Sequence, residues 1–460
     1  MAEPKSSKRC ERLQGSMESP IDSALSGFFE RRLRPGERIC VGFSGGMDSV
    51  VLLHALNRLA KEQDRAIGLS ALHVHHGLSE RADDWARFCE DFCHRCGVPF
   101  EVVRVKVPRD SGEGLEGAAR RLRHGVFAAC RADQLALAHH RDDQAETVLL
   151  NLLRGAGVAG AAGMLAERPQ SRGPTLVRPL LDVPRLAIER YAAEHGLSWI
   201  DDESNADRRF RRNFLRHEIL PRLETTFSGA GKSLARAAGH FAEAAGLLDD
   251  LAGIDREVAS AASGRIALAA LNELPQARAR NLLRHVWTAA GFQAPDTRWI
   301  DEALKQLATA DALSELRVAT AEAALHVYRG ELYLVRLSGG PPAEPLSWSG
   351  QDILPWAGGR VRFRVAMGHG IGRGHLDGAE VVLKARQGGE RLQPDARRPR
   401  RSLRNLLQEA AVPPWERLSL PMLWVNGQLA WVGGIGCDAA FACPPGEEGV
   451  LPLWESTIGD

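Results

Sequence analysis

Between Arg38 and about Asp202, short apolar runs alternate with longer segments in which apolar residues recur every three or four positions. The first pattern is typical of buried strands and the second of amphipathic helices. Strands that alternate with helices build parallel sheets with helices on both faces, so we expect a doubly wound α/β domain. The expected strands are 39–43, 67–74, 100–105 and 134–138, and the expected helices are 50–56, 81–96, 115–132 and 142–154.

Two further parts follow this alternating region. From about Asn213 to Leu337 the chain is rich in Ala, Leu and Arg at helical spacing, and a Gly/Pro-rich break occupies residues 339–345. Beyond the break, short strand-like runs are separated by turns, which favours a small α+β module. We therefore predict an N-terminal extension (1–30), a catalytic α/β domain (31–215), a helical domain (216–340) and a C-terminal α+β domain (346–460).

The composition narrows the class of protein. A formal net charge of +1 over 460 residues gives no global attraction to a polyanion, so a nucleic-acid site must be a local patch. Residues 1–20 are polar and lack the apolar stretch of a signal peptide, and no run approaches the roughly 18 apolar residues of a membrane span. Eight cysteines without a regular framework suggest a reducing compartment, so we expect a cytoplasmic protein with no membrane association.

A glycine-rich turn joins the first expected strand to the first expected helix. Its two glycines allow a close backbone approach to an anion, while the helix start supplies N–H groups and the positive end of its dipole. Asp48 would repel phosphates unless it binds Mg²⁺ that bridges to them. The usual P-loop requires a lysine, and no lysine occurs between Arg38 and Lys61, so this motif is excluded. The alternative to a phosphate site is an ordinary turn between a strand and a helix. The candidate nucleotide-binding residues of the turn are Ser44, Gly45, Gly46, Met47, Asp48 and Ser49.

Polar residues also follow two of the other expected strands. His75 and His76 come after the second strand, and a segment containing His139, His140 and two aspartates comes after the fourth. The carboxyl ends of parallel strands meet at one edge of the sheet, where open α/β sheets bind ligands. We therefore expect these residues to converge with the glycine turn, and we include His75 and His76 among the nucleotide-binding candidates.

Three carboxylates cluster at the start of the helix after the fourth strand. Asp142 and Asp143 are adjacent, and Glu146 follows one turn later. A helix N-cap would explain one of these acids, but it would not explain two of them together with Glu146 and the neighbouring histidines. We therefore predict a site for Mg²⁺ and for a second cation, with Asp48 and Asp142 as metal ligands.

Acidic and arginine-rich segments follow residue 200. The run from Asp201 to Asn205 lies at an expected strand end, and several arginines follow between Arg208 and Arg216. A solvated, charged helix is one interpretation of this pattern. The other is an acidic substrate pocket beside an RNA-facing strip, for which the candidates are Asp202, Asn205, Arg212 and Arg216.

A second arginine cluster lies in the C-terminal module. It places six arginines between residues 391 and 404, with Asp395 as the acid among them, and residues 401–409 have the pattern of a helix. A local basic excess in a nearly neutral chain is where a polyanion should bind, although a solvated loop is the alternative. The cluster contains Arg391, Arg397 and the four candidate RNA contacts Arg398, Arg400, Arg401 and Arg404.

These motifs together resemble the bacterial tRNA(Ile)-lysidine synthetases, a family within the PP-loop (N-type) ATP pyrophosphatases. The resemblance runs from about Arg38 to Val432 and is weakest in the central helical part. One departure is Arg404, where the family more often has Lys, which keeps the charge but changes the shape of the donor. The matching segments are 44–49, 74–78, 119–123, 138–147, 154–157, 178–181, 202–205, 212–216, 388–391, 401–406 and 412–417.

The resemblance implies an adenine nucleotide α hydrolase-like fold and a two-step ligase. ATP and Mg²⁺ would activate the C2 oxygen of the wobble cytidine of a tRNA(Ile) with a CAU anticodon, and L-lysine would then displace AMP. It also implies that Arg120 approaches the triphosphate. Asp142, Asp143, Glu146 and Asp202 are candidates to hold the lysine ammonium and take its proton, and the base is left open among them. A homodimer is also left open.

Two rival functions are considered. A tRNA 2-thiolase on the same core would need catalytic cysteines near the strand ends, but Cys40 and Cys130 are poorly placed for this. Cys89, Cys93 and Cys96 share the apolar face of one expected helix, where cysteine acts as a small hydrophobic residue. A non-catalytic tRNA-binding protein is the other rival, and the intact set of charged motif residues argues against it.

Overall fold

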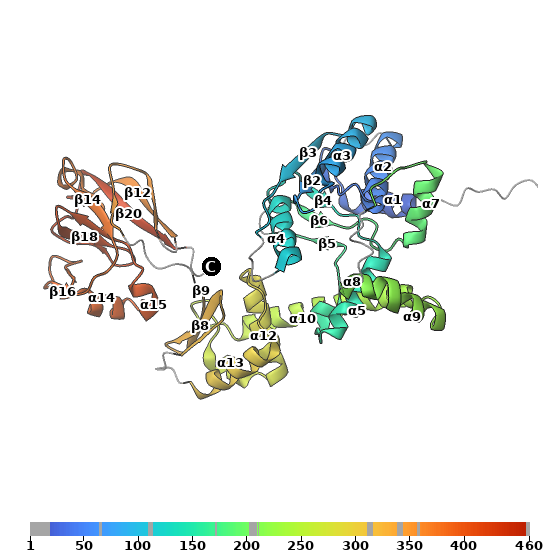
Figure 1. Ribbon diagram of the computed structural model, residues 1–460. Coiled ribbons are helices and arrows are strands. Elements are labelled where there is room, and N and C mark those ends of the chain that lie inside the picture. Colours follow the sequence, from blue (N-terminus) through green and yellow to red (C-terminus); the bar gives the residue numbers. More distant parts are fainter. Residues whose placement is uncertain are drawn as a thin grey trace, which may run out of the picture. The chain divides into compact units, whose positions relative to one another are not determined.

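The computed structural model describes residues 19–63, 67–108, 114–170, 173–201, 209, 211–310, 316–337, 344–356 and 359–456. The chain forms two compact units, Met1–Leu248 and Asp249–Asp460 (Figure 1). The division between the units falls within the long helix α10 (Ala230–Val258). The bounds of the four parts drawn from composition remain predictions.

The first unit contains the predicted parallel sheet. Its strand order is β3-β2-β1-β4-β6-β5, and every neighbouring pair is parallel except β5 and β6. The order reverses direction between β1 and β4, which is the point where open α/β sheets bind ligands. The doubly wound class is confirmed, whereas β5 and β6 were not anticipated. The strands are β1 (Arg38–Gly42), β2 (Gly68–His75), β3 (Phe100–Arg104), β4 (Gln134–Ala136), β5 (Glu167–Arg168) and β6 (Thr175–Val177).

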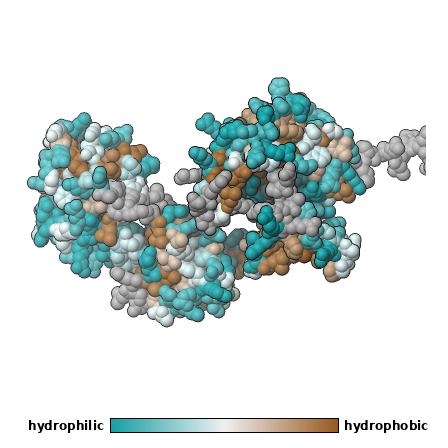
Figure 2. Space-filling view, in the orientation of Figure 1, coloured by the Kyte–Doolittle hydropathy of each residue, from teal (hydrophilic) through white to brown (hydrophobic). Residues whose placement is uncertain are grey.

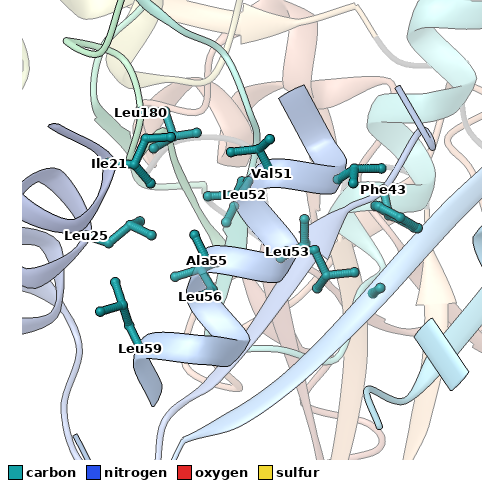
Figure 3. Close-up of a cluster of buried hydrophobic side chains, with 14 of the residues drawn as sticks. Ile21, Leu25, Phe43, Val51, Leu52, Leu53, Ala55, Leu56, Leu59 and Leu180 are labelled. Carbon is teal, nitrogen blue, oxygen red and sulfur yellow. The ribbon is translucent and has the colours of Figure 1, made fainter. Parts of the chain in front are cut away.

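Helices cover both faces of this sheet. Alternate residues of β1 point to opposite faces, so Ile39 and Val41 join the core beneath α2, while Cys40 packs in a smaller cluster with Phe127 of α4. The larger core contains side chains of α1, α2, α3 and α7 (Figure 3). A strand buried on both faces is apolar throughout, which is why the sequence alone predicted a strand at 39–43. The helices are α1 (Pro20–Arg32), α2 (Met47–Glu62), α3 (Ala82–Cys96), α4 (Gly114–Ala128), α5 (Arg141–Leu153), α6 (Val158–Ala161) and α7 (Arg185–Glu194).

The strand expected to end at Asp201 is absent, since residues 197–201 have no regular structure. The backbone N–H of Ile200 instead donates to the carbonyl of Gly45 at 2.9 Å, so this segment is tied to the glycine turn and not to the sheet. The chain then continues into α8 (Arg211–Phe214), the π-helix η2 (Leu215–Ile219), α9 (Leu220–Thr226) and α10.

The second unit begins with the predicted helices but also contains a sheet that was not predicted. Helices α11 (Leu268–Glu273), α12 (Gln276–Ala289) and α13 (Thr297–Thr309) share one core with the antiparallel strands β8 (Ala323–Tyr328) and β9 (Glu331–Arg336), and β7 (Arg317–Ala319) pairs with β8. The region predicted as a helical domain, 216–340, therefore contains helices together with a three-stranded sheet that the sequence did not indicate. Leu325, Val327 and Leu332 supply apolar strand positions that fill this core.

The C-terminal part has the α+β character expected of it. Residues 401–409 were expected to form one helix, but Arg401 pairs with Leu392 in a short ladder, and Ser402 caps α14 by accepting the N–H of Asn405. The strands are β10 (Leu346–Ser347), β11 (Ile353–Trp356), β12 (Gly359–Met367), β13 (Ile371–Gly372), β14 (Val381–Lys384), β15 (Arg391–Leu392), β16 (Arg401–Ser402), β17 (Met422–Val425), β18 (Gln428–Val432), β19 (Gly436–Cys437) and β20 (Glu448–Ser456). The helical elements are the 3₁₀ turn η3 (Arg373–His375), α14 (Leu403–Glu409) and α15 (Pro414–Arg417).

Polar side chains dominate the face of the molecule drawn in Figure 2, with smaller apolar patches between them. Among the described residues, no helix is both long enough and apolar enough to cross a membrane.

Candidate active site

The glycine turn lies at the carboxyl end of β1 and leads directly into α2. Ser44 Oγ lies 3.1 Å from Ser49 Oγ and accepts the N–H of Gly46 at 3.3 Å. The Ser49 hydroxyl also lies 2.9 Å from the carbonyl of Gly46, to which it donates. No side chain caps the start of α2 at Gly46, so the first N–H groups of the helix remain directed outward. This geometry suits an anion at the helix start.

Gly45 is required by both conformation and space. Its φ is +81°, and a Cβ atom placed on it would lie 2.4 Å from Ile200 Cδ1 and 2.9 Å from Cys89 Sγ. A left-handed conformation costs an L-residue about 1–2 kcal/mol, and the two neighbours leave no room for the added carbon. Cys89 is fully buried, which confirms its predicted place in the core.

We expect Gly45→Ala to lower the free energy of unfolding by about 2 kcal/mol or more and to weaken ATP binding. Gly46→Ala is the matched control, because Gly46 has φ −71° and its Cβ would meet one atom, Ser44 Oγ, at 3.5 Å. Chemical denaturation and ATP titration of both variants would check this. Equal effects of the two substitutions would contradict the steric argument.

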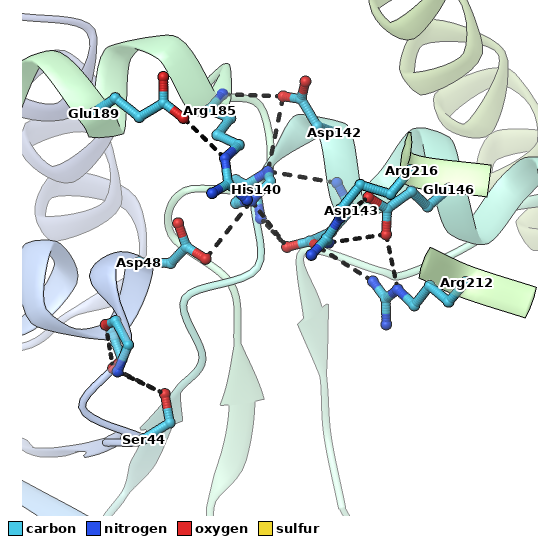
Figure 4. Close-up of polar contacts among 12 residues, drawn as sticks. Ser44, Asp48, His140, Asp142, Asp143, Glu146, Arg185, Glu189, Arg212 and Arg216 are labelled. Carbon is cyan, nitrogen blue, oxygen red and sulfur yellow. Dashed lines mark hydrogen bonds and ion pairs between the residues drawn. The ribbon is translucent and has the colours of Figure 1, made fainter. Parts of the chain in front are cut away.

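His140 lies at the centre of the acidic cluster (Figure 4). Its side chain is 1% exposed, and its ring nitrogens lie 3.8 Å from Asp48 Oδ2, 3.4 Å from Asp143 Oδ2 and 3.7 Å from Asp142 Oδ2. His140 also caps α5. Its Nδ1 accepts the backbone N–H of Asp143, and the Asp143 carboxylate accepts the backbone N–H of His140. The imidazole thus lies between carboxylates of α2 and α5. The segments that follow β1 and β4 therefore come together, as predicted.

Asp48 fits a divalent cation. Its Oδ1 is buried without a hydrogen-bond partner among the described residues, and burial raises the pKa of this carboxyl despite the nearby His140. A buried oxygen with no donor is destabilised unless something positive meets it. No group of three or more His, Cys, Asp or Glu side chains within the described part of the chain is arranged to hold a metal. Mg²⁺ usually takes only one or two protein carboxylates and completes its shell with phosphates and water, so Asp48 is suited to such a site.

Asp142 has a structural partner that the sequence did not reveal. Its Oδ2 accepts the backbone N–H of Arg185 at 2.9 Å, at the first turn of α7. This contact caps α7 from a distant segment, and it leaves the other oxygen of the half-exposed carboxylate available. The assignment of Asp142 as a metal ligand remains a prediction.

Asp143 and Glu146 are held by two arginines from the region after α7 (Figure 4). Arg212 donates to Glu146 at 2.9 Å and to Asp143 at 3.3 Å, and Arg216 donates to the same two carboxylates at 2.5–3.0 Å. Glu146 is 1% exposed and Asp143 is 11% exposed. Two buried anions are thus balanced by two cations in charge-assisted hydrogen bonds. The sequence suggested all four residues but not that they form one cluster.

The arginines also control the ionisation of Asp143. Burial by itself would raise the pKa of this carboxyl, but His140, Arg212, His139 and Arg216 outweigh burial and hold the pKa below its usual value. Asp143 therefore stays ionised at neutral pH. It is a strong anionic site and a correspondingly weak proton acceptor.

The remaining candidates of the first unit lie in different surroundings. His75 is buried with its Nε2 3.2 Å from Asp83 of α3, and Nδ1 of His76 is buried without a hydrogen-bond partner among the described residues. Arg120 is exposed on α4. Asp202 and Asn205 lie outside the described residues. His73 was missed: its Nδ1 donates to the carbonyl of Phe43 at 2.9 Å, directly before the glycine turn, and no sequence signal marked it.

The C-terminal arginines divide into two groups. Arg400 donates to the fully buried Asp438 at 2.9 Å, and Arg401 pairs with Glu409. Both arginines therefore form ion pairs within the C-terminal module. Arg404 is exposed on α14, and Arg398 is 73% exposed with Asp395 3.8 Å away. The second group is the better placed for an RNA backbone.

We expect the double variant Arg398→Ala/Arg404→Ala to weaken tRNA binding and to flatten the log–log salt dependence by roughly 1.5, the value for two lost phosphate contacts. Arg400→Ala is the control. It should lower the free energy of unfolding by about 1–2 kcal/mol, because Asp438 loses its charged donor, with little change in the slope. Binding titrations at several salt concentrations would check both, and an unchanged slope in the double variant would contradict the assignment.

The fold and the site define a class of protein. A Ser-Gly-Gly-Met-Asp-Ser turn lies at the switch point of a doubly wound sheet, and residues 17–223 match the family model for the PP-loop domain. Residues 267–333 match the TilS substrate binding domain, and residues 381–454 match the TilS substrate C-terminal domain.

Relatives along the whole chain give the particular family. The tRNA(Ile)-lysidine synthase of Aromatoleum aromaticum is 46% identical, covering 92% of this chain and 98% of that protein. The tRNA(Ile)-lysidine synthase of Nitrosomonas europaea is 41% identical, with 95% and 96% covered. This chain belongs to the tRNA(Ile)-lysidine synthase family. Among solved structures, the U34-tRNA thiolase NcsA from Methanococcus maripaludis matches with a TM-score of 0.42 at 20% identity, over 48% of this chain and 78% of that one.

Proposed function

We propose that this chain is an ATP-dependent ligase that joins L-lysine to C2 of the wobble cytidine of a tRNA(Ile) with a CAU anticodon. The observation that carries the proposal is family membership over nearly the whole chain, including the PP-loop domain and both TilS substrate domains. The product nucleoside, lysidine, changes the codon read from AUG to AUA. The rival functions, a 2-thiolase and a non-catalytic tRNA-binding protein, have less support.

The first step turns a poor leaving group into a good one. The C2 oxygen of cytidine attacks the α-phosphorus of ATP, the bond to pyrophosphate breaks, and the base carries AMP. The glycine turn and the start of α2 would bind the departing phosphates, and exposed Arg120 would approach the triphosphate. Asp48 would hold Mg²⁺, which would supply positive charge to stabilise the departing pyrophosphate.

The second step needs a neutral amine. Lysine has a pKa near 10.4, so about one molecule in 2,500 is neutral at pH 7, and deprotonation costs about 4.6 kcal/mol. Asp143 and Glu146 would bind the ammonium beside the arginines that hold them in place. Because the pKa of Asp143 is lowered, we assign Asp143 to binding the cation, and the group that takes the proton is left open among Asp142, Glu146 and Asp202. Arg212 and Arg216 would orient both acids, and Asp202 and Asn205 remain predicted substrate contacts.

Incubation of the purified protein with ATP, labelled lysine and an unmodified tRNA(Ile) transcript with a CAU anticodon tests the function. Nucleoside mass analysis should show one lysine added to one cytidine, with AMP and pyrophosphate released in equal amounts. A tRNA(Met) transcript with the same anticodon is the control for specificity. Incorporation of sulfur, or tRNA binding without ATP turnover, would favour one of the rivals.

A further inference from the structure

A buried histidine that plays no part in the proposed reaction lies next to the start of the glycine turn. His73 is on β2 and is 7% exposed. Its Nδ1 lies 2.9 Å from the carbonyl oxygen of Phe43, the residue directly before Ser44. A carbonyl oxygen can only accept a hydrogen bond, so the imidazole carries a proton on Nδ1 and donates it to this contact.

This hydrogen bond is made where the chain leaves the sheet. β1 and β2 pair in parallel as far as Gly42 and Leu72, and the N–H of Phe43 donates to the carbonyl of Leu72 at 2.8 Å. The His73 side chain then donates to the carbonyl of Phe43, a buried residue of the main core (Figure 3). A buried carbonyl without a donor is destabilised. The imidazole therefore satisfies the last peptide group before the backbone turns towards Ser44.

Side chains of α3 hold the same place from the other side. The sulfur of the fully buried Cys89 lies 3.8 Å from Nδ1 of His73, and it would lie 2.9 Å from a Cβ atom on Gly45. The ring of Phe43 packs against Phe92 with the centroids 5.7 Å apart. The imidazole is thus enclosed between the end of β1 and α3, and its contacts lead directly to the glycine turn.

The imidazole is neutral at neutral pH. Burial lowers the pKa of His73, the bond to Phe43 acts in the opposite direction, and the nearby His75 lowers the pKa further. A neutral ring supplies no positive charge to a phosphate, and its Nδ1 proton is already donated to the backbone. Any effect of His73 on ATP must therefore pass through the backbone that it holds.

We propose that His73 is a positioning residue of the ATP site. Its Nδ1–H fixes the carbonyl of Phe43 and thereby the orientation of Ser44, Gly45 and the first N–H groups of α2. The inference rests on the proposed function only in assigning ATP to this turn. Donors that are held in place before an anion arrives need no ordering when it binds, so a braced turn should bind the phosphates more tightly than a loose one.

Three substitutions of His73 separate the hydrogen bond from packing. Asn is smaller than His but carries an amide nitrogen on Cγ, as His carries Nδ1. Leu fills more of the space without a donor, and Gln places its amide nitrogen one atom further out, as Nε2 is. Calorimetric titration of the full chain with ATP and Mg²⁺, without tRNA or lysine, measures the effect. We expect His73→Asn to bind ATP within about threefold of the wild type, and His73→Leu and His73→Gln to bind about tenfold more weakly, the usual scale for one hydrogen bond.

His54→Leu is the matched control. His54 is half-buried on α2, and its Nδ1 lies 3.0 Å from the hydroxyl of Tyr191 on α7, so this variant also loses one hydrogen bond of the same unit. It should lower the midpoint of chemical denaturation about as much as His73→Leu does and leave the ATP affinity unchanged. An equal loss of ATP affinity in both variants would show a general effect of stability and would overturn the proposal.

Two other outcomes would also overturn the proposal. One is ATP binding by His73→Leu as tight as that of the wild type, and the other is weaker binding by His73→Asn than by His73→Leu, since packing would then decide. If His73→Leu does not fold, the comparison of Asn with Gln decides in the same way. Because ATP binding is measured without lysine and tRNA, a failure of lysine ligation would contradict the proposed function and leave this comparison intact.

NMR of isotope-labelled histidine in the wild-type chain gives a test that does not depend on any variant. The His73 ring should be largely neutral and protonated on Nδ1 at about pH 6.5, where an ordinary histidine is half charged. A neutral ring with its proton on Nε2 could not donate to Phe43 and would overturn the proposal.

Discussion

Replacing Asp48 with Asn should reduce pyrophosphate release by at least about 10²-fold, the usual scale for the loss of one electrostatic stabiliser. The substitution keeps the volume of the side chain but removes the charge that a Mg²⁺ ligand needs. Because Asp48 Oδ1 is buried without a donor, the neutral amide should leave the fold intact or slightly more stable. Pyrophosphate release measured over a Mg²⁺ titration would show the lower rate and a higher Mg²⁺ requirement.

Two aspartates nearby serve as comparisons for this variant. Asp182 is exposed in the segment before α7, so Asp182→Asn should leave the rate unchanged. Asp142→Asn keeps an oxygen that can accept the N–H of Arg185, so a large loss of rate in this variant would support Asp142 as a second metal ligand. Near-normal turnover of Asp48→Asn would show that the glycine turn is not the ATP site.

Replacing Glu146 with Gln should slow lysine transfer by about 10²-fold and leave adenylated tRNA detectable. Glu146 accepts hydrogen bonds from both Arg212 and Arg216. A neutral amide in its place would no longer balance the positive charge of these two arginines. Asp143 still balances part of the guanidinium charge, so we expect the free energy of unfolding to fall by only about 1–3 kcal/mol. Single-turnover assays that follow AMP-linked tRNA and lysine incorporation separately would resolve the two steps.

Glu189→Gln is the matched control for this experiment. Glu189 also pairs with an arginine, Arg185 at 3.0 Å, but on the exposed surface of α7, where an ion pair contributes little. It should leave both steps and the stability unchanged. If adenylation and transfer fall equally in Glu146→Gln, the carboxylate belongs to the ATP site, and the proposed division between the two steps is wrong.

The sequence was sufficient for the elements that depend on local pattern. The strand β1 was expected at 39–43 and is found at Arg38–Gly42, and the helix after it begins at Met47, within the glycine motif. An apolar run is informative here because both faces of β1 are covered. The convergence of Asp48 with His140 also followed from a general rule, since parallel strand ends meet at one edge.

Pairings that depend on distant segments could not be predicted in the same way. Arg216 was expected to face substrate, but the structure pairs it with Glu146, 70 residues earlier in the chain. Arg400 was expected to contact RNA, but it holds the buried Asp438. In each case the sequence shows a charge, and only the packing of another segment decides its partner. The strands β7–β9 were missed for a related reason, because their short apolar runs lie among residues with helical composition.

The order of the strands also affects how the first unit forms during synthesis. β1 lies between β2 and β4, and Arg38 N–H donates to the carboxylate of Asp133, 95 residues later. Contacts across such long intervals must close large loops before they stabilise anything, which slows folding. While the ribosome is still making the region around β4, one edge of β1 has no partner, and an unpaired apolar strand is prone to aggregate. Conditions that slow translation through this region should therefore expose the nascent chain to chaperones for longer.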